Sequence, residues 1–409
     1  MLRLDDTDTS RGTQEYEDAI YEDMKWLGLE WDKFDRQTAR YDRYAEAFEV
    51  LKQAGRLYPC YETPEELDIK RKVQLSRGKP PIYDRSALDL TEADIKKFEE
   101  EGRVPHWRFK LAAGKIEWQD EGRGGLVSFD AAHIGDPVLY RADMKPIYML
   151  ASTMDDIDHG VTHVIRGEDH ITNTAIMIQI CEALGGTPPT FAHLSMITMT
   201  DGEKMSKRKG STGIRDLREQ GIEPLAIVSH LSKLGSSDAI EVRTSMQALC
   251  DEFDISKYSR ATPKFDSKEL LALNAKLLHQ MPFDQVKPKL DAMGVEISES
   301  FWNTVRGNLS SLSELQEWMH VINGPVSPVI QDSGFAETAA GLLPAEPWDR
   351  ETFKAWTGEL KEKSGRKGKE LFMPIRLALT GMEHGPELPD LLPLLGYDKT
   401  LKRLQGEAV

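Results

Sequence analysis

The chain has 409 residues, a formal net charge of −16 and an apolar content of 40%. This length predicts two or three domains, and the apolar content is enough to build packed cores, which excludes wholesale disorder. No stretch approaches the roughly 20 apolar residues of a membrane-spanning helix, and the first residues lack the pattern of a secretory signal. The three cysteines, Cys60, Cys181 and Cys250, are widely spaced, so no disulfide framework is expected and the cytoplasm is the expected location.

The first part of the chain alternates predicted strands and helices, which indicates an α/β layer. Residues 1–4 predict a strand that ends in a polar turn at Asp5, where α/β folds bind ligands. The elements expected next are a helix from residue 13 that ends at Gly28, a helix over 42–54 and an extended segment from 57.

From about residue 63 to 136 the pattern changes to short strands and many charges, which predicts an inserted region of mixed fold. The α/β pattern then resumes. We expect an apolar strand over 146–152, a strand over 161–165, a polar loop over 167–173, a helix over 174–184 and a strand over 190–198. Beyond Gly210 helical periodicity dominates, with examples at 269–279, 301–321 and 353–363.

The segment Lys204-Met-Ser-Lys-Arg208 carries three cations and a hydroxyl within five residues, between Gly202 and Gly210. Glycines allow a loop to close over a ligand, and lysines placed there can neutralise charge that develops on phosphates. As a charge cluster alone, the segment is more typical of a solvated basic loop.

Other polar residues permit several interpretations. Arg166 follows a predicted strand, where its planar guanidinium could bind a carboxylate through two nitrogens. Tyr148, within an apolar run, is by itself more typical of a core residue. Thr9, Ser10 and Asn173 are candidate helix caps.

Two metal sites are weak possibilities. Calcium ligation by Asp6, Asp8, Ser10 and Glu17 is disfavoured because Arg11 stands where the calcium loop needs glycine. Zinc ligation by His159, His163 and His170 is disfavoured because no convincing helix places them together.

Two local basic runs stand out against the acidic total, over residues 69–85 and 361–376. Recognition of nucleic acid needs a local basic surface, although each run alone is more typical of a solvated face.

The ordered combination of motifs resembles the bacterial class I glutamyl-tRNA synthetases. The motifs are Leu2-Arg-Leu-Asp-Asp-Thr-Asp8, Ile147-Tyr-Met-Leu-Ala-Ser152 with Asp155-Asp156, His163-Val-Ile-Arg-Gly-Glu-Asp-His170 and Lys204-Met-Ser-Lys-Arg208. The resemblance continues into Gly368–Arg376 and Thr380–Glu387, and so covers nearly the whole chain. It implies an ATP-dependent activation of L-glutamate, followed by transfer of the glutamyl group to tRNA.

The resemblance assigns roles residue by residue. Lys204, Ser206 and Lys207 match the catalytic loop, in which the lysines stabilise the ATP phosphates and Met205 supports the loop. The matches to glutamate-binding positions are Asp5, Tyr148 and Arg166. The remaining matches to ATP-binding positions are Asp169, near the ribose, and Ile197, at the adenine. Mg²⁺ is implied by the ATP chemistry. Because Cys60 is the only cysteine in the insertion, no zinc is expected.

The sequence departs from the family at its start. The family begins with a strand and a His-Ile-Gly-His-type motif, whereas Met1 stands at the next strand. His133-Ile-Gly-Asp136 lies in the insertion and is not that motif. We therefore expect an N-terminal truncation, for which a misassigned start codon is one explanation, and poor or absent glutamate activation by the 409-residue chain.

The expected architecture is a Rossmann-like catalytic domain, incomplete at its N-terminus, with an α+β insertion and an all-helical anticodon-binding domain. The expected divisions are catalytic residues 1–56 and 141–210, an acceptor-stem-binding insertion over 57–140, a stem-contact helical segment over 211–283 and the anticodon-binding domain over 284–409. Expected partners are tRNA(Glu) and L-glutamate, with tRNA(Gln) a further candidate, and a monomer is the family default. Two alternatives stay open: a non-catalytic tRNA-binding paralogue and, disfavoured by the helical tail, a glutaminyl-tRNA synthetase.

Overall fold

The computed structural model describes residues 1–7, 13–202 and 213–409. These residues form two compact units. The first contains the described residues up to 202 together with Lys233–Ala239 and Glu252–Phe265. The second contains the described residues of 213–232, 240–251 and 266–409. Among the helices of these residues, none combines the length and the apolar character needed to cross a bilayer.

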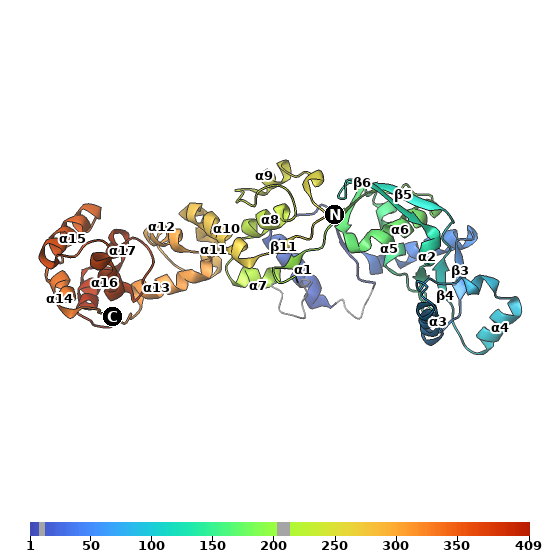
Figure 1. Ribbon diagram of the computed structural model, residues 1–409, viewed down its shortest axis with the longest axis horizontal. Coiled ribbons are helices and arrows are strands. Elements are labelled where there is room, and N and C mark those ends of the chain that lie inside the picture. The colour runs from blue at the N-terminus through green and yellow to red at the C-terminus, as the bar shows by residue number, and fades with distance from the viewer. Residues whose placement is uncertain (8–12, 203–212) are drawn as a thin grey trace. The chain divides into compact units, whose positions relative to one another are not determined.

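The first unit is built on small sheets (Figure 1). The largest has the strand order β6 (Gly125–Asp130), β5 (Lys115–Asp120), β9 (Thr190–Leu194), β8 (His163–Gly167). Strand β9 runs parallel to both β5 and β8, and β5 and β6 form an antiparallel pair. Strand β1 (Leu2–Leu4) pairs in parallel with β2 (Phe34–Arg36), and β10 (Thr198–Met199) with β11 (Lys264–Phe265).

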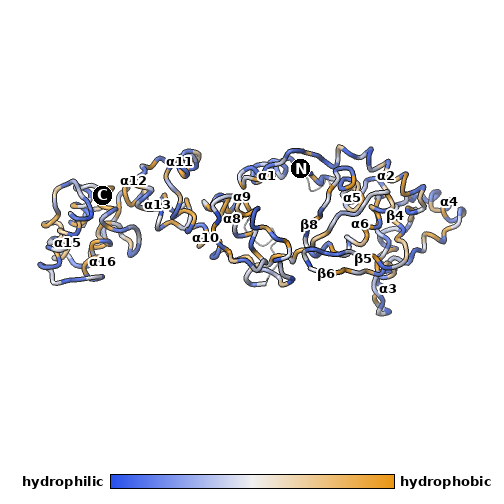
Figure 2. Tube along the Cα trace, turned by 90° about the horizontal axis from the view of Figure 1, so that it is seen from above, coloured by the Kyte–Doolittle hydropathy of each residue, from blue (hydrophilic) through white to orange (hydrophobic). Residues whose placement is uncertain are grey.

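The insertion forms a separate antiparallel sheet of β3 (Leu57–Cys60), β4 (His106–Phe109) and β7 (Val138–Tyr140). Its helices are α3 (Pro64–Ser76) and α4 (Glu92–Glu100). A capping box fixes the start of α3, because the Thr63 side chain accepts from Glu66 N–H while the Glu66 side chain accepts from Thr63 N–H. No residue of α3 is buried, and its far end is hydrophilic (Figure 2). A mixed fold for the insertion is therefore confirmed.

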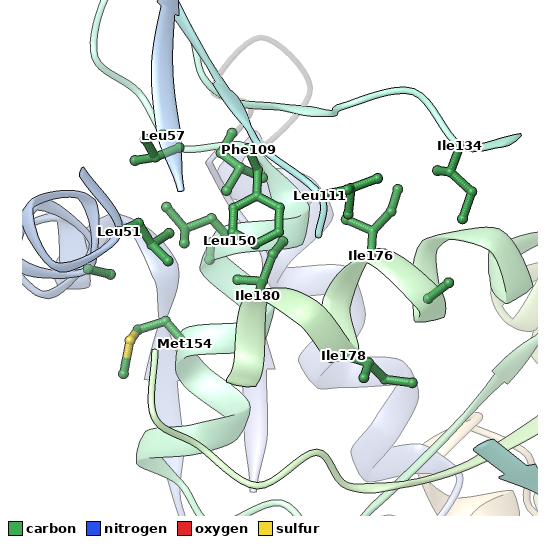
Figure 3. Packing of buried hydrophobic residues seen from close by; sticks show 14 of the residues in the cluster. Leu51, Leu57, Phe109, Leu111, Ile134, Leu150, Met154, Ile176, Ile178 and Ile180 are labelled. Atoms are coloured by element: carbon green, nitrogen blue, oxygen red, sulfur yellow. The ribbon is translucent and has the colours of Figure 1, made fainter. Parts of the chain in front are cut away.

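Helices α2 (Tyr41–Gln53), α5 (Tyr148–Asp158) and α6 (Ile171–Ala183) supply much of the first unit's core. Tyr44, Phe48 and Leu51 recur at helical spacing along α2 and are buried, as their periodicity predicts. Leu150 of α5 and Ile180 of α6 lie beside Phe109 in the same cluster (Figure 3). Helix α1 (Gln14–Trp26) forms where expected, but none of its residues is buried.

The second unit is helical. Its helices are α7 (Ile214–Glu219), most of α8 (Pro224–Lys233), α9 (Met246–Asp251), α10 (Ser267–Gln280), α11 (Phe283–Ala292), α12 (Glu299–Val305), α13 (Leu315–Asn323), α14 (Ser333–Gly341), α15 (Arg350–Ser364), α16 (Lys369–Thr380), α17 (Leu388–Leu395) and α18 (Tyr397–Leu404). Arg403 is buried and donates to the carbonyl oxygens of Val321, Gly324 and Leu379, which ties α18 to α13 and α16. An all-helical C-terminal region is thus confirmed.

Several local predictions are wrong. Residues 148–158 form helix α5, not a strand, because this helix is buried on most sides and its apolar run hides the helical period. Helix α6 begins at Ile171, so Asn173 lies inside it and does not cap it. The expected helix over 301–321 is two helices, α12 and α13, separated by short 3₁₀ turns. Thr9 and Ser10 lie outside the described residues.

Candidate active site

Arg166 and Tyr148 come together in the first unit. Arg166 lies near the carboxyl end of β8, and Tyr148 is the first residue of α5. The Arg166 Nη1 donates to the Tyr148 hydroxyl at 3.1 Å. Tyr148 is 36% exposed, so its ring is not the core side chain that its apolar surroundings in the sequence suggested. A guanidinium and a phenol that share one hydrogen bond can together hold a carboxylate.

Asp5 reaches the same helix through Arg3. The Arg3 Nε donates to Asp5 Oδ1 at 2.7 Å, and its Nη2 donates to Ser152 Oγ at 3.4 Å. Ser152 and Tyr148 are four residues apart on α5 and therefore lie on one face. The structure thus brings Asp5, Tyr148 and Arg166 to one stretch of this helix. The sequence analysis missed Arg3, although it stands inside the motif that ends at Asp8.

Neighbouring carboxylates keep Arg3 positively charged. Burial alone would lower the pKa of Arg3, but its hydrogen bond to Asp5 and the charges of Asp5 and Asp156 raise it. Burial raises the pKa of Asp156, against the opposing effect of Arg3. Arg3 therefore stays cationic and Asp5 has a permanent counter-ion beside it.

Asp169 and Ile197 lie after the carboxyl ends of neighbouring strands β8 and β9, the edge where α/β sheets bind ligands. Gly167 lies tightly between the two segments. A Cβ atom at Gly167 would stand 2.6 Å from Asp169 Oδ1 and 2.8 Å from the sulfur of Met196, the neighbour of Ile197. Any larger residue at this position would therefore displace the Asp169 and Met196 side chains. The other four candidates, Lys204, Met205, Ser206 and Lys207, lie outside the described residues.

Behind Arg166 lies a buried polar cluster that the sequence analysis also missed. Asp120, His193 and Thr174 are 1%, 2% and 0% exposed. The Arg166 Nη2 lies 2.5 Å from Thr174 Oγ1, and His193 Nδ1 lies 2.5 Å from Asp120 Oδ2. The parallel pairing of β8 with β9 sets Arg166 opposite His193, and the parallel pairing of β5 with β9 brings Asp120 to the same ring.

The possible metal ligands have other partners. His159 Nε2 lies 2.8 Å from Asp35 Oδ2, and His170 packs edge-on against the Tyr148 ring. Asp136 of the His133–Asp136 segment accepts hydrogen bonds from Tyr58 and Arg85. Within residues 1–7, 13–202 and 213–409, no three histidine, cysteine or acidic side chains are grouped to hold a metal ion.

The two basic runs are only partly neutralised within the protein. In the first run Lys70, Lys72 and Arg85 form ion pairs with nearby carboxylates. In the second run three lysines are exposed and form no ion pair with any described residue: Lys361, Lys367 and Lys369. Lys361 lies in the last turn of α15, Lys369 begins α16, and Lys367 lies between the two helices.

Comparison with known proteins agrees with this arrangement. Residues 1–272 match the family model of the class I tRNA synthetases (E and Q), catalytic domain, and residues 304–407 match the model of an anticodon-binding domain. Fold and site thus define a class I aminoacyl-tRNA synthetase.

Relatives narrow this class. The chain is 50% identical over its whole length to glutamate–tRNA ligase 1 of Maricaulis maris and 52% identical to the glutamate–tRNA ligase of Azospirillum brasilense, and it covers 92% and 91% of these proteins. The crystal structure of a glutamate–tRNA synthetase from Elizabethkingia anophelis superposes with a TM-score of 0.84 at 27% identity, over 98% of this chain and 91% of that one. The chain belongs to the glutamate–tRNA ligase family. The expected family is therefore confirmed, and the family's reaction makes ATP a substrate.

Proposed function

We propose that this chain is a glutamate–tRNA ligase that activates L-glutamate with ATP and transfers it to the 3′ end of tRNA(Glu). The observation that carries the proposal is the hydrogen-bonded pair of Arg166 and Tyr148. It lies in a chain about half of whose residues are identical to those of glutamate–tRNA ligases. A cationic site suits a substrate with a carboxylate side chain and leaves a neutral amide without a matching charge.

In the first step an oxygen of the glutamate α-carboxylate attacks the α-phosphate of ATP. The bond from that phosphorus to the β-phosphate oxygen breaks, so that glutamyl-adenylate and pyrophosphate form. We assign Arg166 and Tyr148 to the side-chain carboxylate of glutamate and Asp5 to its ammonium group. In the second step a hydroxyl of the terminal tRNA ribose attacks the acyl carbon, and AMP leaves.

The nucleotide is assigned to the carboxyl ends of β8 and β9. Asp169 would contact the ribose, and the backbone of Ile197 would contact the adenine. We assign stabilisation of the phosphates to Lys204 and Lys207 and support of their loop to Met205 and Ser206. Little covalent chemistry is left to the protein, so positioning and electrostatic stabilisation carry catalysis.

Mg²⁺ would arrive with the ATP phosphates. Among the described residues no three histidine, cysteine or acidic side chains are grouped to hold a metal ion, and we assign no side chain to Mg²⁺ and route no step through it. As partners we propose tRNA(Glu), with tRNA(Gln) a second candidate, and a monomeric enzyme in the cytoplasm.

The test is ATP–pyrophosphate exchange with tRNA present, using glutamate and glutamine in parallel. It is run on the 409-residue chain and on a chain extended by translation of the upstream DNA. Glutamate-dependent exchange that is lost in Arg166→Gln supports the proposal.

Two outcomes favour the alternatives. Exchange that depends on glutamine would indicate a glutaminyl-tRNA synthetase. No exchange from either chain, with tRNA binding intact, would indicate a non-catalytic tRNA-binding paralogue.

A further inference from the structure

A chain of hydrogen bonds runs from the proposed glutamate-binding side of Arg166 into the protein interior. The Arg166 Nη2 donates to Thr174 Oγ1 at 2.5 Å. Thr174 Oγ1 lies 2.8 Å from His193 Nε2, and His193 Nδ1 lies 2.5 Å from Asp120 Oδ2. The proposed reaction uses none of the three buried residues directly.

The donors around the His193 ring assign its tautomer. The Arg166 Nε donates to His193 Nε2 at 3.5 Å, and Thr174 Oγ1 lies 2.8 Å from the same nitrogen. A guanidinium N–H can only donate, so Nε2 must accept and carries no proton. The ring proton is then on Nδ1, which donates to Asp120.

Asp120 is held as a carboxylate by further donors. It accepts from the backbone N–H groups of His193 and Arg123, each at 3.0 Å, and from the Trp118 indole at 3.1 Å. Burial would raise the pKa of Asp120, but the hydrogen bonds from His193 and the other donors lower it.

His193 itself is neutral. Burial lowers its pKa, and so do the nearby charges of Arg166 and Arg123, while Asp120 opposes them. Protonation would place an Nε2–H against the Arg166 guanidinium. The buried negative charge of Asp120 therefore balances Arg166 across a neutral ring.

The order Asp120, His193, Thr174 resembles the arrangement of a hydrolytic triad, in which the hydroxyl would be a nucleophile. Thr174 cannot act in this way, because its residue is wholly buried and its oxygen already accepts from Arg166. The cluster faces a guanidinium and not a substrate pocket, so its role is to orient that guanidinium.

We propose that Asp120, His193 and Thr174 are positioning residues that fix the Arg166 guanidinium in the plane needed to bind the glutamate side-chain carboxylate. This proposal rests on the proposed function of Arg166. The cluster engages Nε and Nη2, and Tyr148 engages Nη1, so the rigid guanidinium is oriented before the substrate binds. A guanidinium that must be reoriented on binding loses affinity for glutamate but not for ATP.

The first test reads the tautomer directly. Nitrogen-15 NMR of the histidine-labelled 409-residue chain should show a protonated Nδ1 and an unprotonated Nε2 for His193, identified by its loss in His193→Gln. A protonated Nε2 would overturn the positioning proposal while leaving the proposed function intact.

The second test uses Thr174→Val, which removes the hydroxyl at nearly constant volume, and Asp120→Asn, which permits the other tautomer. For each we expect the KM for glutamate, or its dissociation constant by titration calorimetry, to rise about tenfold or more, while that for ATP stays within about twofold. Thr174→Ser restores the hydroxyl and should recover most of the affinity for glutamate.

Thr153→Val is the matched control. Thr153 is also buried in this unit, and its hydroxyl donates to a backbone carbonyl, that of Met149. A merely structural role for Thr174 predicts equal losses for glutamate and ATP and the same losses in the control, and that result would overturn the proposal. If Arg166→Gln leaves glutamate binding unchanged while the tautomer is as assigned, the proposed function of Arg166 fails and not the geometry of the cluster.

Discussion

Arg3 and Asp156 form an ion pair at 3.0 Å that joins the first strand to helix α5. Their side chains are only 18% and 15% exposed. The same guanidinium binds Asp5, so one residue links the fold to the proposed ammonium-binding carboxylate. Loss of Arg3 should therefore affect both stability and the site.

We predict that Arg3→Gln lowers the free energy of unfolding by about 2–3 kcal/mol at pH 8 and by less at pH 5. Burial already raises the pKa of Asp156 in the folded state. Ionisation of this carboxyl therefore costs the folded protein stability as the pH rises. Removal of Arg3 raises that pKa further, and the penalty grows as the pH rises through it. Urea unfolding at the two pH values measures the difference.

Arg43→Gln is the control, because Arg43 is more exposed and its ion pairs with Asp158 and Glu46 lie at the surface. Its effect should stay below about 1 kcal/mol. An Arg3→Gln penalty that is equal at both pH values would contradict the role given to Asp156.

Tyr148→Phe removes the hydroxyl that accepts from Arg166. We expect the KM for glutamate to rise about threefold to tenfold, the effect of removing one hydrogen bond, with little change in the KM for ATP. Exchange kinetics measure both constants on whichever chain, the 409-residue or the extended one, shows glutamate-dependent exchange. Tyr61→Phe, which removes a hydroxyl bonded to Glu99 in the insertion, should leave both unchanged. If the KM for glutamate is the same in Tyr148→Phe and Tyr61→Phe, Tyr148 does not contact glutamate.

Gly167→Ala tests the assignment of the nucleotide. The new methyl group would stand within 3 Å of Asp169 Oδ1 and of the Met196 sulfur, and both side chains must move. We expect the KM for ATP to rise about threefold to tenfold, which corresponds to a loss of about 1 kcal/mol of binding free energy. The KM for glutamate should change less.

Gly358→Ala in α15, where a Cβ atom meets no neighbour within 4 Å, controls for the substitution. If the KM for ATP is the same in Gly167→Ala as in Gly358→Ala, the ribose does not bind beside Asp169.

The exposed lysines Lys361, Lys367 and Lys369 are candidates for tRNA contact. Their replacement by glutamate should weaken tRNA binding and reduce the dependence of log K on log salt by about 0.7–0.9 for each phosphate that is no longer neutralised. Binding titrations at several salt concentrations measure the slope. Lys354→Glu, which reverses one surface charge in α15, is the control for the single variant Lys367→Glu. An unchanged slope in the triple variant would exclude these lysines from the tRNA surface.

Local patterns in the sequence predict much of the fold. The apolar period of α2 is confirmed because this helix buries one clear face, and the extended segment from residue 57 is confirmed as strand β3. Helix α5 could not be recognised, since it is buried on several sides and reads as a continuous apolar run. The buried polar cluster behind Arg166 could not be predicted either, because Asp120 and His193 meet only through the long-range pairing of strands in the β6-β5-β9-β8 sheet.

The site was predicted more completely than its supports. The family resemblance predicted Asp5, Tyr148 and Arg166 as glutamate-binding residues, and the structure brings them to one helix, while their roles stay predictions. Arg3 and Thr174 act through other side chains, and no spacing in the sequence reports such an indirect role.

A crystal structure of the chain with a non-hydrolysable glutamyl-adenylate analogue tests the central claim most directly. Our account predicts that the glutamate side-chain carboxylate lies within hydrogen-bond distance of the Arg166 guanidinium and the Tyr148 hydroxyl, with the ribose beside Asp169. A carboxylate bound away from Arg166, with that guanidinium still bonded to Tyr148 and Thr174, would contradict it.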